Sequence, residues 1–230
     1  RSISNELDEL TIKPTRILCK HKDVKRINIE EFNRLESPIE HEIDAQNTVL
    51  KRVRAVGSTA GGYVYNETTE MTEQEALDKL GDRAEYQAPQ HIKLREGCQL
   101  ILTFNINVKK KHVNGSRCVY NNGMIKFIDD SELKLEQVMH DFVYPLGENF
   151  YLKRKQLALR YGWAITCHSS QGMSLDSARI DLGKDVFANG QAYVALSRVR
   201  SAEGLYIDNF VRTSIKTSKD AIEFMESIDQ

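Results

Sequence analysis

The stretch Tyr161-Gly-Trp-Ala-Ile-Thr-Cys-His-Ser-Ser-Gln-Gly172 decides the fold class of this 230-residue chain. It predicts a helix over residues 163–170, which the final glycine ends by taking a left-handed backbone conformation. Further along, apolar residues predict strands at 178–182 and 204–207, with another helix at 191–200 between them. Such alternation of strands and helices is typical of an α/β domain with a parallel sheet.

The chain begins with a unit of the same kind. Residues Thr15 to Cys19 predict a short buried strand, and a helix should follow, with Asp23 as its N-cap and an end near Pro38. Residues 38–93 show no sustained pattern and are expected to form an irregular connection. Its interpretable pieces are a strand at 53–56, a flexible glycine-rich segment at 57–62 and a capped helix at 72–80.

Between residues 94 and 159 the pattern changes to short β segments. The expected strands cover 99–104, 117–120, 124–128, 137–143 and 150–159. The turn sequences between them are Asn114-Gly115, Asn121-Asn-Gly123 and Pro145-Leu-Gly147. This density of strands is typical of a small barrel. We therefore expect an α/β parallel-sheet domain, made of residues 1–93 and 160–230, that is interrupted by an inserted β-barrel over 94–159.

Residues 211–230 are expected to hold an amphipathic C-terminal helix. Ser218 is its expected cap, and apolar residues recur at helical spacing: Ala221, Phe224, Met225 and Ile228. We expect this apolar stripe to dock on the sheet.

Charge and cysteine content exclude several classes of protein. The net charge of -1 means that nucleic-acid binding would depend on local clusters of Lys and Arg. No apolar run reaches membrane-spanning length, and Arg1 to Leu10 is acidic and polar rather than a secretory signal. Because the chain starts without a methionine, we expect a fragment of a longer intracellular protein. The cysteines lie far apart in sequence and are expected to be reduced thiols rather than a zinc site or disulfides: Cys19, Cys98, Cys118 and Cys167.

Two short patterns carry candidate chemistry. In the expected helix from Gln191, the Gln191 amide and the Arg198 guanidinium share one face, which suits an anionic, polyoxygenated group. The alternative is a surface helix with a solvated arginine. In the first stretch, the side chains of residues 168–171 are able to hydrogen-bond a sugar-phosphate backbone without reading sequence. The alternative there is an ordinary polar C-cap.

Together the two patterns resemble motor motifs of superfamily-1 helicases, most closely the Pif-type and RecD-like branch. Residues 158–176, Ala158-Leu-Arg-Tyr-Gly-Trp-Ala-Ile-Thr-Cys-His-Ser-Ser-Gln-Gly-Met-Ser-Leu-Asp176, look like motif V. Gly190-Gln-Ala-Tyr-Val-Ala-Leu-Ser-Arg198 looks like motif VI. The segment from Leu94 to Arg117 is similar to the opening of the family's inserted SH3-like barrel, domain 2B, and Pro14 to Asn28 resembles the motif IV region of its RecA-like domain 2A.

The resemblance implies roles for the matching residues. Arg198 would be the catalytic arginine finger that reaches the γ-phosphate of ATP, with Gln191 and Gly172 also on the nucleotide side. The residues that would contact single-stranded DNA are His168, Ser169, Ser170 and Gln171. Basic and polar residues expected along the same DNA path are Lys109, Lys110, Lys111, Asn114 and Arg160.

The chain departs from the family's pattern in two places. The family usually has a lysine where this chain has Ser169. No Gly-x-x-x-x-Gly-Lys-[Ser/Thr] loop, which would cradle phosphates, occurs in the sequence. The acidic pair in Ile128-Asp-Asp-Ser131 is explained by turn chemistry rather than metal binding. The resemblance therefore implies that ATP and Mg²⁺ are bound mainly by a first motor domain outside this chain, and that this chain alone is inactive.

The sequence thus predicts the C-terminal part of an ATP-dependent helicase that moves 5′ to 3′ along single-stranded DNA and unwinds duplex. The expected partners are single-stranded DNA, forked or duplex DNA and the N-terminal motor domain, with no membrane and a monomeric state. The expected location is the nucleus, the mitochondrion or a viral replication site. The alternatives are a related RNA helicase and a non-catalytic module whose SH3-like barrel binds a peptide.

Overall fold

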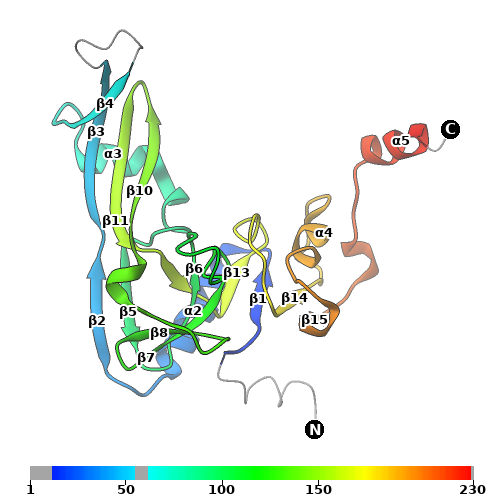
Figure 1. Ribbon diagram of the computed structural model, residues 1–230. Helices are drawn as coiled ribbons and strands as arrows, with labels where there is room; N and C mark the ends of the chain where they lie inside the picture. Colours follow the sequence, from blue (N-terminus) through cyan, green and yellow to red (C-terminus); the bar gives the residue numbers. More distant parts are fainter. Residues whose placement is uncertain (1–11, 55–61, 229–230) are drawn as a thin grey trace.

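The structure, a computed structural model, describes residues 12–54 and 62–228 of the chain. These residues form an α/β arrangement with a parallel sheet, two larger antiparallel sheets and a two-stranded antiparallel sheet (Figure 1). None of the described helices is long and apolar enough to cross a bilayer.

The parallel sheet has the strand order β13-β1-β14-β15. Ile17 lies opposite Ile165 on one side and opposite Ile180 on the other. All three side chains are buried, so the centre of this sheet is apolar on both sides of β1. The expected strands near 15–19, 178–182 and 204–207 are therefore confirmed. The strands are β1 (Thr15–Leu18), β13 (Ala164–Thr166), β14 (Ala178–Asp181) and β15 (Leu205–Asp208).

Helix α2 (His21–Arg34) follows β1 as expected and covers the edge strand β13. It buries Phe32, and its Asn28 side chain satisfies both backbone groups of Ala164, with hydrogen bonds of 2.9 Å in each direction. The helix begins before the expected cap. Asp23 lies in the first turn, where a negative charge interacts favourably with the helix dipole.

The helix expected over residues 163–170 is wrong. Residues 164–166 form strand β13, and a tight turn follows them. The reason is burial: every residue from Gly162 to Cys167 is buried, which is typical of a strand in a covered parallel sheet and leaves no solvent-facing side for a surface helix. Gly172 does have the expected left-handed conformation, with φ of 76°.

A five-stranded antiparallel sheet in the order β12-β6-β7-β8-β9 lies beside the parallel sheet. Asn122 (φ 48°) and Gly123 (φ 76°) make the two-residue loop between β7 and β8, and positive φ at both positions is typical of tight hairpins. The turn expected at 121–123 is thus confirmed. The strands are β6 (Gln99–Leu102), β7 (Arg117–Asn121), β8 (Met124–Phe127), β9 (Glu132–Lys134) and β12 (Leu159–Tyr161).

A long arm, at the upper left of Figure 1, is built from the sheet β10-β11-β3-β4. Its strands are β3 (Gln46–Arg54), β4 (Tyr63–Glu67), β10 (Met139–Gly147) and β11 (Phe150–Leu157). Helix α3 (Glu73–Leu80) packs on one face of the arm through Ala76 and Leu80. The two-stranded sheet pairs β2 (Ile39–Asp44) with β5 (His91–Arg95).

Residues 38–93 are therefore regular where the structure describes them, and the expectation of an irregular connection is corrected. Strand β3 pairs with β11, so its partner lies far away in the sequence and local patterns do not reveal it. Residues 53–54 of the strand expected at 53–56 form the end of β3, and the rest of that expectation falls in residues 55–61, which lie outside the described residues. The division of the chain at residues 94 and 159 stays a prediction.

Helix α5 (Lys219–Ile228) lies away from the rest of the chain in Figure 1. The expected cap is confirmed, because the Ser218 hydroxyl accepts a hydrogen bond from Ala221 N (3.1 Å). The expected docking on the sheet is wrong: none of its residues is buried, and Phe224 and Met225 are exposed. The remaining short helices are α4 (Gln191–Leu196), η1 (Gly81–Arg83), η2 (Leu135–Val138), η3 (Ala202–Gly204) and η4 (Arg212–Ser214).

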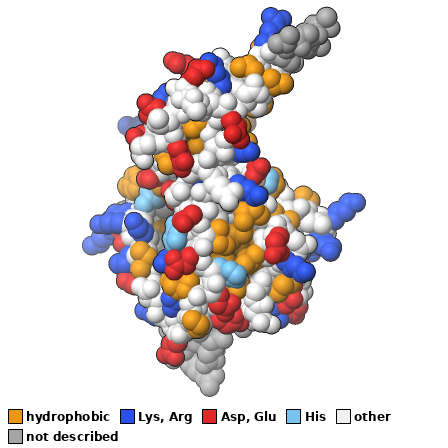
Figure 2. Space-filling view, turned by 90° about the vertical axis from the view of Figure 1, so that its left-hand side faces the viewer, with side chains coloured by type: hydrophobic (Ala, Val, Ile, Leu, Met, Phe, Trp, Pro, Cys, Tyr) orange, Lys and Arg blue, Asp and Glu red, His pale blue; other side chains and the backbone are white. Residues whose placement is uncertain are grey.

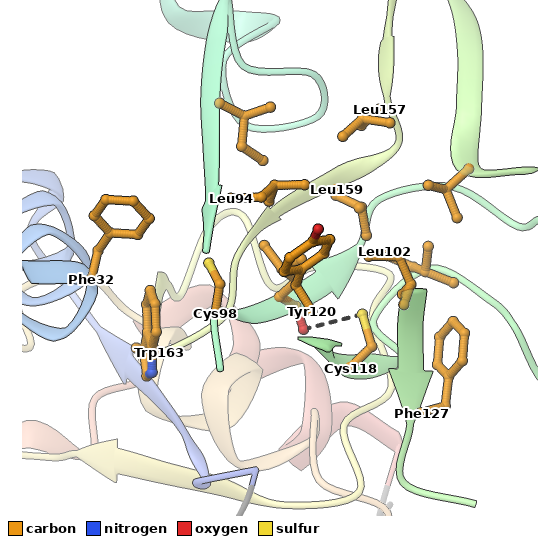
Figure 3. Close-up of a cluster of buried hydrophobic side chains, with 14 of the residues drawn as sticks. Phe32, Leu94, Cys98, Leu102, Cys118, Tyr120, Phe127, Leu157, Leu159 and Trp163 are labelled. Atoms are coloured by element: carbon orange, nitrogen blue, oxygen red, sulfur yellow. Dashed lines mark hydrogen bonds between the residues drawn. The ribbon is translucent and has the colours of Figure 1, made fainter. Parts of the chain in front are cut away.

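One buried cluster joins the parallel sheet to the five-stranded sheet (Figure 3). Phe32 from α2 and Trp163 from the approach to β13 lie on one side of Cys98, and Tyr120 and Leu102 lie on the other. Each large apolar side chain buried in this way contributes about 1.5–3 kcal/mol. The two sheets therefore share a core rather than being joined only by the chain.

Candidate functional site

The segment between β13 and β14 lies at the carboxyl edge of the parallel sheet, where open α/β sheets bind ligands. We refer to residues 168–172 as the site loop. Hydrogen bonds from Ser170 N to Thr166 O and from Met173 N to Ser170 O, both 3.0 Å, close its backbone. Gly172 completes the turn in a conformation that other residues adopt only at a cost.

The site loop exposes only some of its polar side chains. His168 and Gln171 are exposed and able to reach a ligand. Ser169 is half-buried, and its hydroxyl lies 2.8 Å from Thr166 Oγ1. Ser170 is fully buried and donates to Cys167 O (2.6 Å). The two serines therefore hold the loop in shape, and Ser170 presents no hydroxyl to a ligand in this structure.

The second stretch forms α4 and the turn after it. Gln191 is the first residue of α4, and its Oε1 accepts from Phe187 N (3.1 Å) and Ala188 N (3.2 Å). The helix ends at Leu196, earlier than the expected residue 200. Arg198 therefore lies just beyond the helix and does not share a helical face with Gln191.

Arg198 is held at the C-terminal end of α4. Its Nε donates to Val194 O (2.9 Å) and its Nη2 to Ser197 Oγ (2.7 Å). A cation at this end of a helix is favourable because the last carbonyls carry partial negative charge. The described residues include no carboxylate paired with Arg198, so its charge is not neutralised within them.

The two stretches are joined through their backbones. Leu175 N donates to Arg198 O (2.8 Å), and Arg200 N donates to Leu175 O (3.0 Å). These bonds make a parallel bridge between Leu175 and Val199, next to a fully buried Leu175 side chain. The backbone that carries Arg198 is thus attached directly to the segment that follows the site loop.

Arg160 lies beneath the site loop rather than on an open surface. Its side chain is buried; Nη1 donates to Tyr86 O (3.1 Å) and Nη2 lies 3.6 Å from Met173 Sδ. Burial lowers the pKa of Arg160 to about 10. Within the described part of the chain, Nε has no hydrogen-bond partner and no carboxylate is paired with this guanidinium.

A pocket of about 170 Å³ opens beside Arg160. Asn28 from α2, Tyr86 from the segment after α3, and Thr166 and Ser169 from the site-loop region contribute its polar lining. Sequence reasoning missed Tyr86 and Asn28, because nothing in their own segments marks them as neighbours of Arg160. The lining also includes His91 and Glu85, and the Glu85 carboxylate is paired with Arg154 (2.9 Å) rather than with Arg160. The buried guanidinium of Arg160 is therefore the group in this pocket that suits an anion.

The lysine-rich loop lies between β6 and β7. Lys109, Lys110 and Lys111 are exposed, and Asn114 N donates to Asn105 Oδ1 (2.8 Å). The base of the loop packs against the residues after the site loop: a Cβ added at Gly115 would lie 3.0 Å from Met173 Cβ. The base of the lysine-rich loop thus packs against the residues that directly follow the site loop.

An ion pair that sequence reasoning also missed fixes this arrangement. Arg117 in β7 is buried and binds both carboxylate oxygens of Asp176, with Nε 2.8 Å from Oδ1. Bidentate pairs of this kind fix geometry as well as adding energy. Because the two residues lie far apart in sequence, only the fold reveals the pair. It ties the five-stranded sheet to the chain that leaves the site loop.

The described residues offer no metal centre. No group of three or more His, Cys, Asp or Glu side chains among them is placed to hold a metal ion. The acidic pair at 129–130 forms a turn as predicted: Asp129 Oδ1 accepts from Ser131 Oγ (2.6 Å), and Asp130 has φ of 61°. Hydrogen bonds from Ser131 lower the pKa of Asp129.

Charge is mixed on the face shown in Figure 2. Acidic, basic and apolar side chains lie close together there, and Lys and Arg gather mainly at the two flanks. This agrees with the net charge of -1. A polyanion would therefore depend on local groups such as the lysine-rich loop and Arg160.

Comparisons with known proteins identify relatives. No family model matches the chain. The protein named ATP-dependent DNA helicase PIF1 of Danio rerio is 38% identical over 145 residues, covering 60% of this chain and 22% of that protein. The human protein of the same name is 35% identical over 170 residues, covering 67% of this chain and 26% of that protein. The chain is homologous to the Pif1 DNA helicases.

A viral protein and solved structures extend the likeness over nearly the whole chain. The uncharacterized protein 030L of Invertebrate iridescent virus 6 is 27% identical over 97% of this chain and 52% of its own length. The crystal structure of Pif1 helicase from Candida albicans has a TM-score of 0.68 and 21% identity, covering 95% of this chain and 50% of that one. Bacteroides Pif1 in complex with ADP-AlF3 and ssDNA has a TM-score of 0.54 and 21% identity.

The chain therefore has the same fold as the matching part of these Pif1 helicase structures. The chain spans about half the length of the solved Pif1 chains and a quarter or less of most of the curated PIF1 proteins that it matches.

Proposed function

We propose that this chain is the C-terminal part of an ATP-dependent DNA helicase, which moves 5′ to 3′ on single-stranded DNA and unwinds duplex. In this assignment the parallel sheet belongs to a RecA-like domain 2A, and the five-stranded antiparallel sheet to an inserted SH3-like barrel, domain 2B. Homology to the Pif1 DNA helicases supports the assignment. The names of these relatives also favour DNA over RNA as the substrate.

The observation that carries the proposal is the backbone bridge between Leu175 and Val199. It connects the site loop, which would contact DNA, to Arg198, which would contact ATP. A helicase motor needs such a connection, because ATP hydrolysis has to change the affinity of the DNA-contacting residues for DNA. Two direct hydrogen bonds between the segments provide a short mechanical path.

Arg198 would act as the arginine finger. ATP, when bound against a first motor domain, would supply a γ-phosphate on which negative charge develops during transfer. The partners of Arg198 in this structure are a neutral carbonyl and a neutral hydroxyl rather than a carboxylate. Exchanging these two partners for phosphate oxygens would place the guanidinium where it stabilises that charge. Gln191 and Gly172 would lie on the same side, and the phosphate loop and Mg²⁺ ligands would come from the N-terminal motor domain of the same protein.

DNA would run over the site loop and the base of the lysine-rich loop. His168, Gln171 and the partly exposed Ser169 would contact the sugar-phosphate backbone, and Arg160 would take one phosphate in its pocket. The flanking contacts would come from Lys109, Lys110, Lys111 and Asn114. Contacts of this kind are electrostatic and independent of base sequence, as a translocating enzyme requires.

The test is Arg198→Ala in the full-length enzyme. We expect ATP hydrolysis stimulated by single-stranded DNA to fall by about 10³-fold or more, as for other arginine fingers, while DNA affinity without nucleotide stays within about twofold. Arg200→Ala is the matched control, because Arg200 is exposed and lies two positions further along the same segment. Equal loss of hydrolysis in the two variants, or retained hydrolysis in Arg198→Ala, would show that Arg198 is not the finger.

A further inference from the structure

Cys19 and Cys167 are neighbours in space although they lie far apart in sequence. Each follows directly after a strand, Cys19 after β1 and Cys167 after β13, and these strands pair in parallel with Leu18 opposite Thr166. Cys167 N donates to Leu18 O (2.8 Å), which continues the pairing beyond the strand ends. The two sulfur atoms are 3.9 Å apart.

This position is compatible with a disulfide. Neighbouring strands lie about 4.8 Å apart, and bonded cysteines have Cα atoms about 4.4–6.8 Å apart. Both residues lie beyond the last paired strand residues, so closing the sulfur–sulfur gap needs only side-chain rotation and a small backbone shift. Both cysteines are free thiols in this structure, as the sequence predicts.

The two thiols differ in access and in proton affinity. Cys19 is half-exposed and Cys167 is buried. The pKa of Cys19 is lowered because the Cys167 thiol hydrogen-bonds to its sulfur, with a smaller contribution from Lys20; burial, Asp181 and Asp185 act in the opposite direction. The pKa of Cys167 is raised by the same hydrogen bond and by burial. A partly exposed cysteine with a lowered pKa, beside a buried thiol with a raised pKa, is the arrangement found at reactive cysteines.

We propose that Cys19 and Cys167 form a modification site for hydroperoxides, with Cys19 as the attacking thiolate and Cys167 as the resolving thiol. The Cys19 sulfur attacks the peroxide oxygen; the S–O bond forms, the O–O bond breaks, and the leaving alkoxide takes a proton to become an alcohol. The Cys167 sulfur then attacks the sulfur of the Cys19 sulfenic acid; the S–S bond forms, the S–O bond breaks, and the leaving hydroxide takes the Cys167 proton and becomes water. Two thiols are oxidised by two electrons and one peroxide is reduced.

The disulfide would tether the site loop. Cys167 directly precedes the site loop. Cys19 lies between the end of β1 and Lys20, the N-cap residue of α2. In the oxidised chain, the disulfide would therefore hold Cys167, and with it the start of the site loop, at the end of β1. Any effect of this disulfide on DNA binding rests on the proposed function. The formation of the disulfide does not depend on that function.

The other two cysteines provide an internal control. Cys98 and Cys118 are fully buried in the core of the five-stranded sheet. Burial raises the pKa of Cys98 to about 12, and the Cys118 thiol hydrogen-bonds to Leu100 O (3.6 Å). We expect both to resist peroxide under conditions that oxidise Cys19.

The test is peptide mapping by mass spectrometry after the folded full-length protein is treated with hydrogen peroxide and its remaining thiols are alkylated. We expect a Cys19–Cys167 cross-link that a thiol reductant reverses, while Cys98 and Cys118 are alkylated. In Cys167→Ser, dimedone should trap Cys19 as a sulfenic acid; in Cys19→Ser, Cys167 should stay reduced. The proposal is overturned if the wild-type protein gives no cross-link, or if Cys98 or Cys118 is oxidised as fast.

Amide hydrogen exchange tests the tether without relying on DNA binding. Exchange in residues 168–172 should slow at least severalfold in the oxidised wild-type protein and should not change in peroxide-treated Cys167→Ser. Unchanged exchange in a protein that carries the cross-link would overturn the tether. A reduced protein that fails to bind single-stranded DNA would instead contradict the proposed function and leave the cross-link result intact.

Discussion

Arg160 and Arg154 are both buried arginines, and they differ in what neutralises them. Arg154 donates to Glu85 (2.9 Å), to Asn47 and to Ala88 O, so its charge has a carboxylate partner. The guanidinium of Arg160 makes contacts only with a carbonyl oxygen and a thioether sulfur, and its Nε has no partner in the described part of the chain. A buried cation without a counter-charge destabilises the fold, and natural proteins keep such groups mainly where a ligand supplies the missing charge.

We expect Arg160→Met to stabilise the fold and to weaken DNA binding. At neutral pH, the free energy of unfolding should rise by about 1–3 kcal/mol because the desolvated charge is removed. Because the pKa of Arg160 is lower in the folded protein than in the unfolded chain, the unfolded chain binds more protons above about pH 10. The gain should therefore be fully present below pH 10 and should fade as the pH rises further.

Denaturant unfolding and single-stranded DNA affinity together measure this effect. Arg154→Met is the matched control and should lose about 2 kcal/mol or more, since it breaks a buried, fully hydrogen-bonded pair. If Arg160→Met destabilised the protein as much as Arg154→Met, the Arg160 guanidinium would be a structural group. The proposal that the pocket beside Arg160 binds a phosphate would then be contradicted.

Among the elements, α3 is the one whose start the sequence places best. Thr72 Oγ1 accepts from Glu75 N (3.2 Å), and Glu75 Oε2 accepts from Thr72 N (2.8 Å), which completes a capping box. The hydrogen bonds that Glu75 Oε2 accepts from Thr72 N and from the Thr72 hydroxyl (2.9 Å) lower the pKa of Glu75. The helix covers one face of the arm, so its first turn affects the stability of that sheet.

We expect Thr72→Ala to lower the free energy of unfolding by about 1 kcal/mol at pH 7. Since the pKa of Glu75 is depressed in the folded state, the contribution of its carboxylate is present above its unfolded pKa and is lost as the pH falls through the folded value. The difference between wild type and Thr72→Ala should therefore shrink below about pH 4. Thr69→Ala, at an exposed position just before the helix, should leave stability unchanged. If the loss of unfolding free energy in Thr72→Ala did not change with pH, the capping box would stabilise the helix through Thr72 alone, without a contribution from the Glu75 carboxylate.

Elements that depend on local pattern were predictable, and elements that depend on distant partners were not. The strand at Thr15–Leu18, the Asn122-Gly123 turn and the cap at Thr72 follow from residues that are adjacent in sequence. Strand β13 resembled a helix because its polar neighbours look like a helix end, whereas burial beside β1 decides its conformation. The apolar stripe of α5 predicted docking, but amphipathicity does not specify which surface, if any, covers it.

At the scale of the whole molecule, the proposed site residues come from the parallel sheet and from the five-stranded sheet, and in the proposed function they supply only part of a nucleotide site. Motif resemblance placed Arg198 and the site loop in one unit, and the bridge at Leu175 joins them. The resemblance did not reveal the Arg117–Asp176 pair or the pocket beside Arg160, because these depend on how the two sheets pack. No phosphate-binding loop occurs in the sequence, and the described residues contain no metal-ligand cluster.

We therefore expect the 230-residue chain by itself to hydrolyse ATP no faster than the background rate. Without a loop that binds phosphate and metal, Arg198 has no aligned substrate to stabilise. A coupled assay with and without single-stranded DNA measures this directly. DNA-stimulated hydrolysis by the pure chain that disappears in Arg198→Ala would show that the chain holds a complete nucleotide site.

The position of β1 has a consequence for synthesis of the chain on the ribosome. Strands β6 to β9 are close in sequence and can pair as they emerge, whereas β1 waits for β13 and β14, so the parallel sheet cannot close before residue 181 has been made. Contacts over such long sequence separations form slowly. During that interval β1 lacks both of its partners in the parallel sheet, and an unpaired strand edge is prone to aggregation. Early translation arrest would thus leave a folded antiparallel sheet attached to an exposed β1.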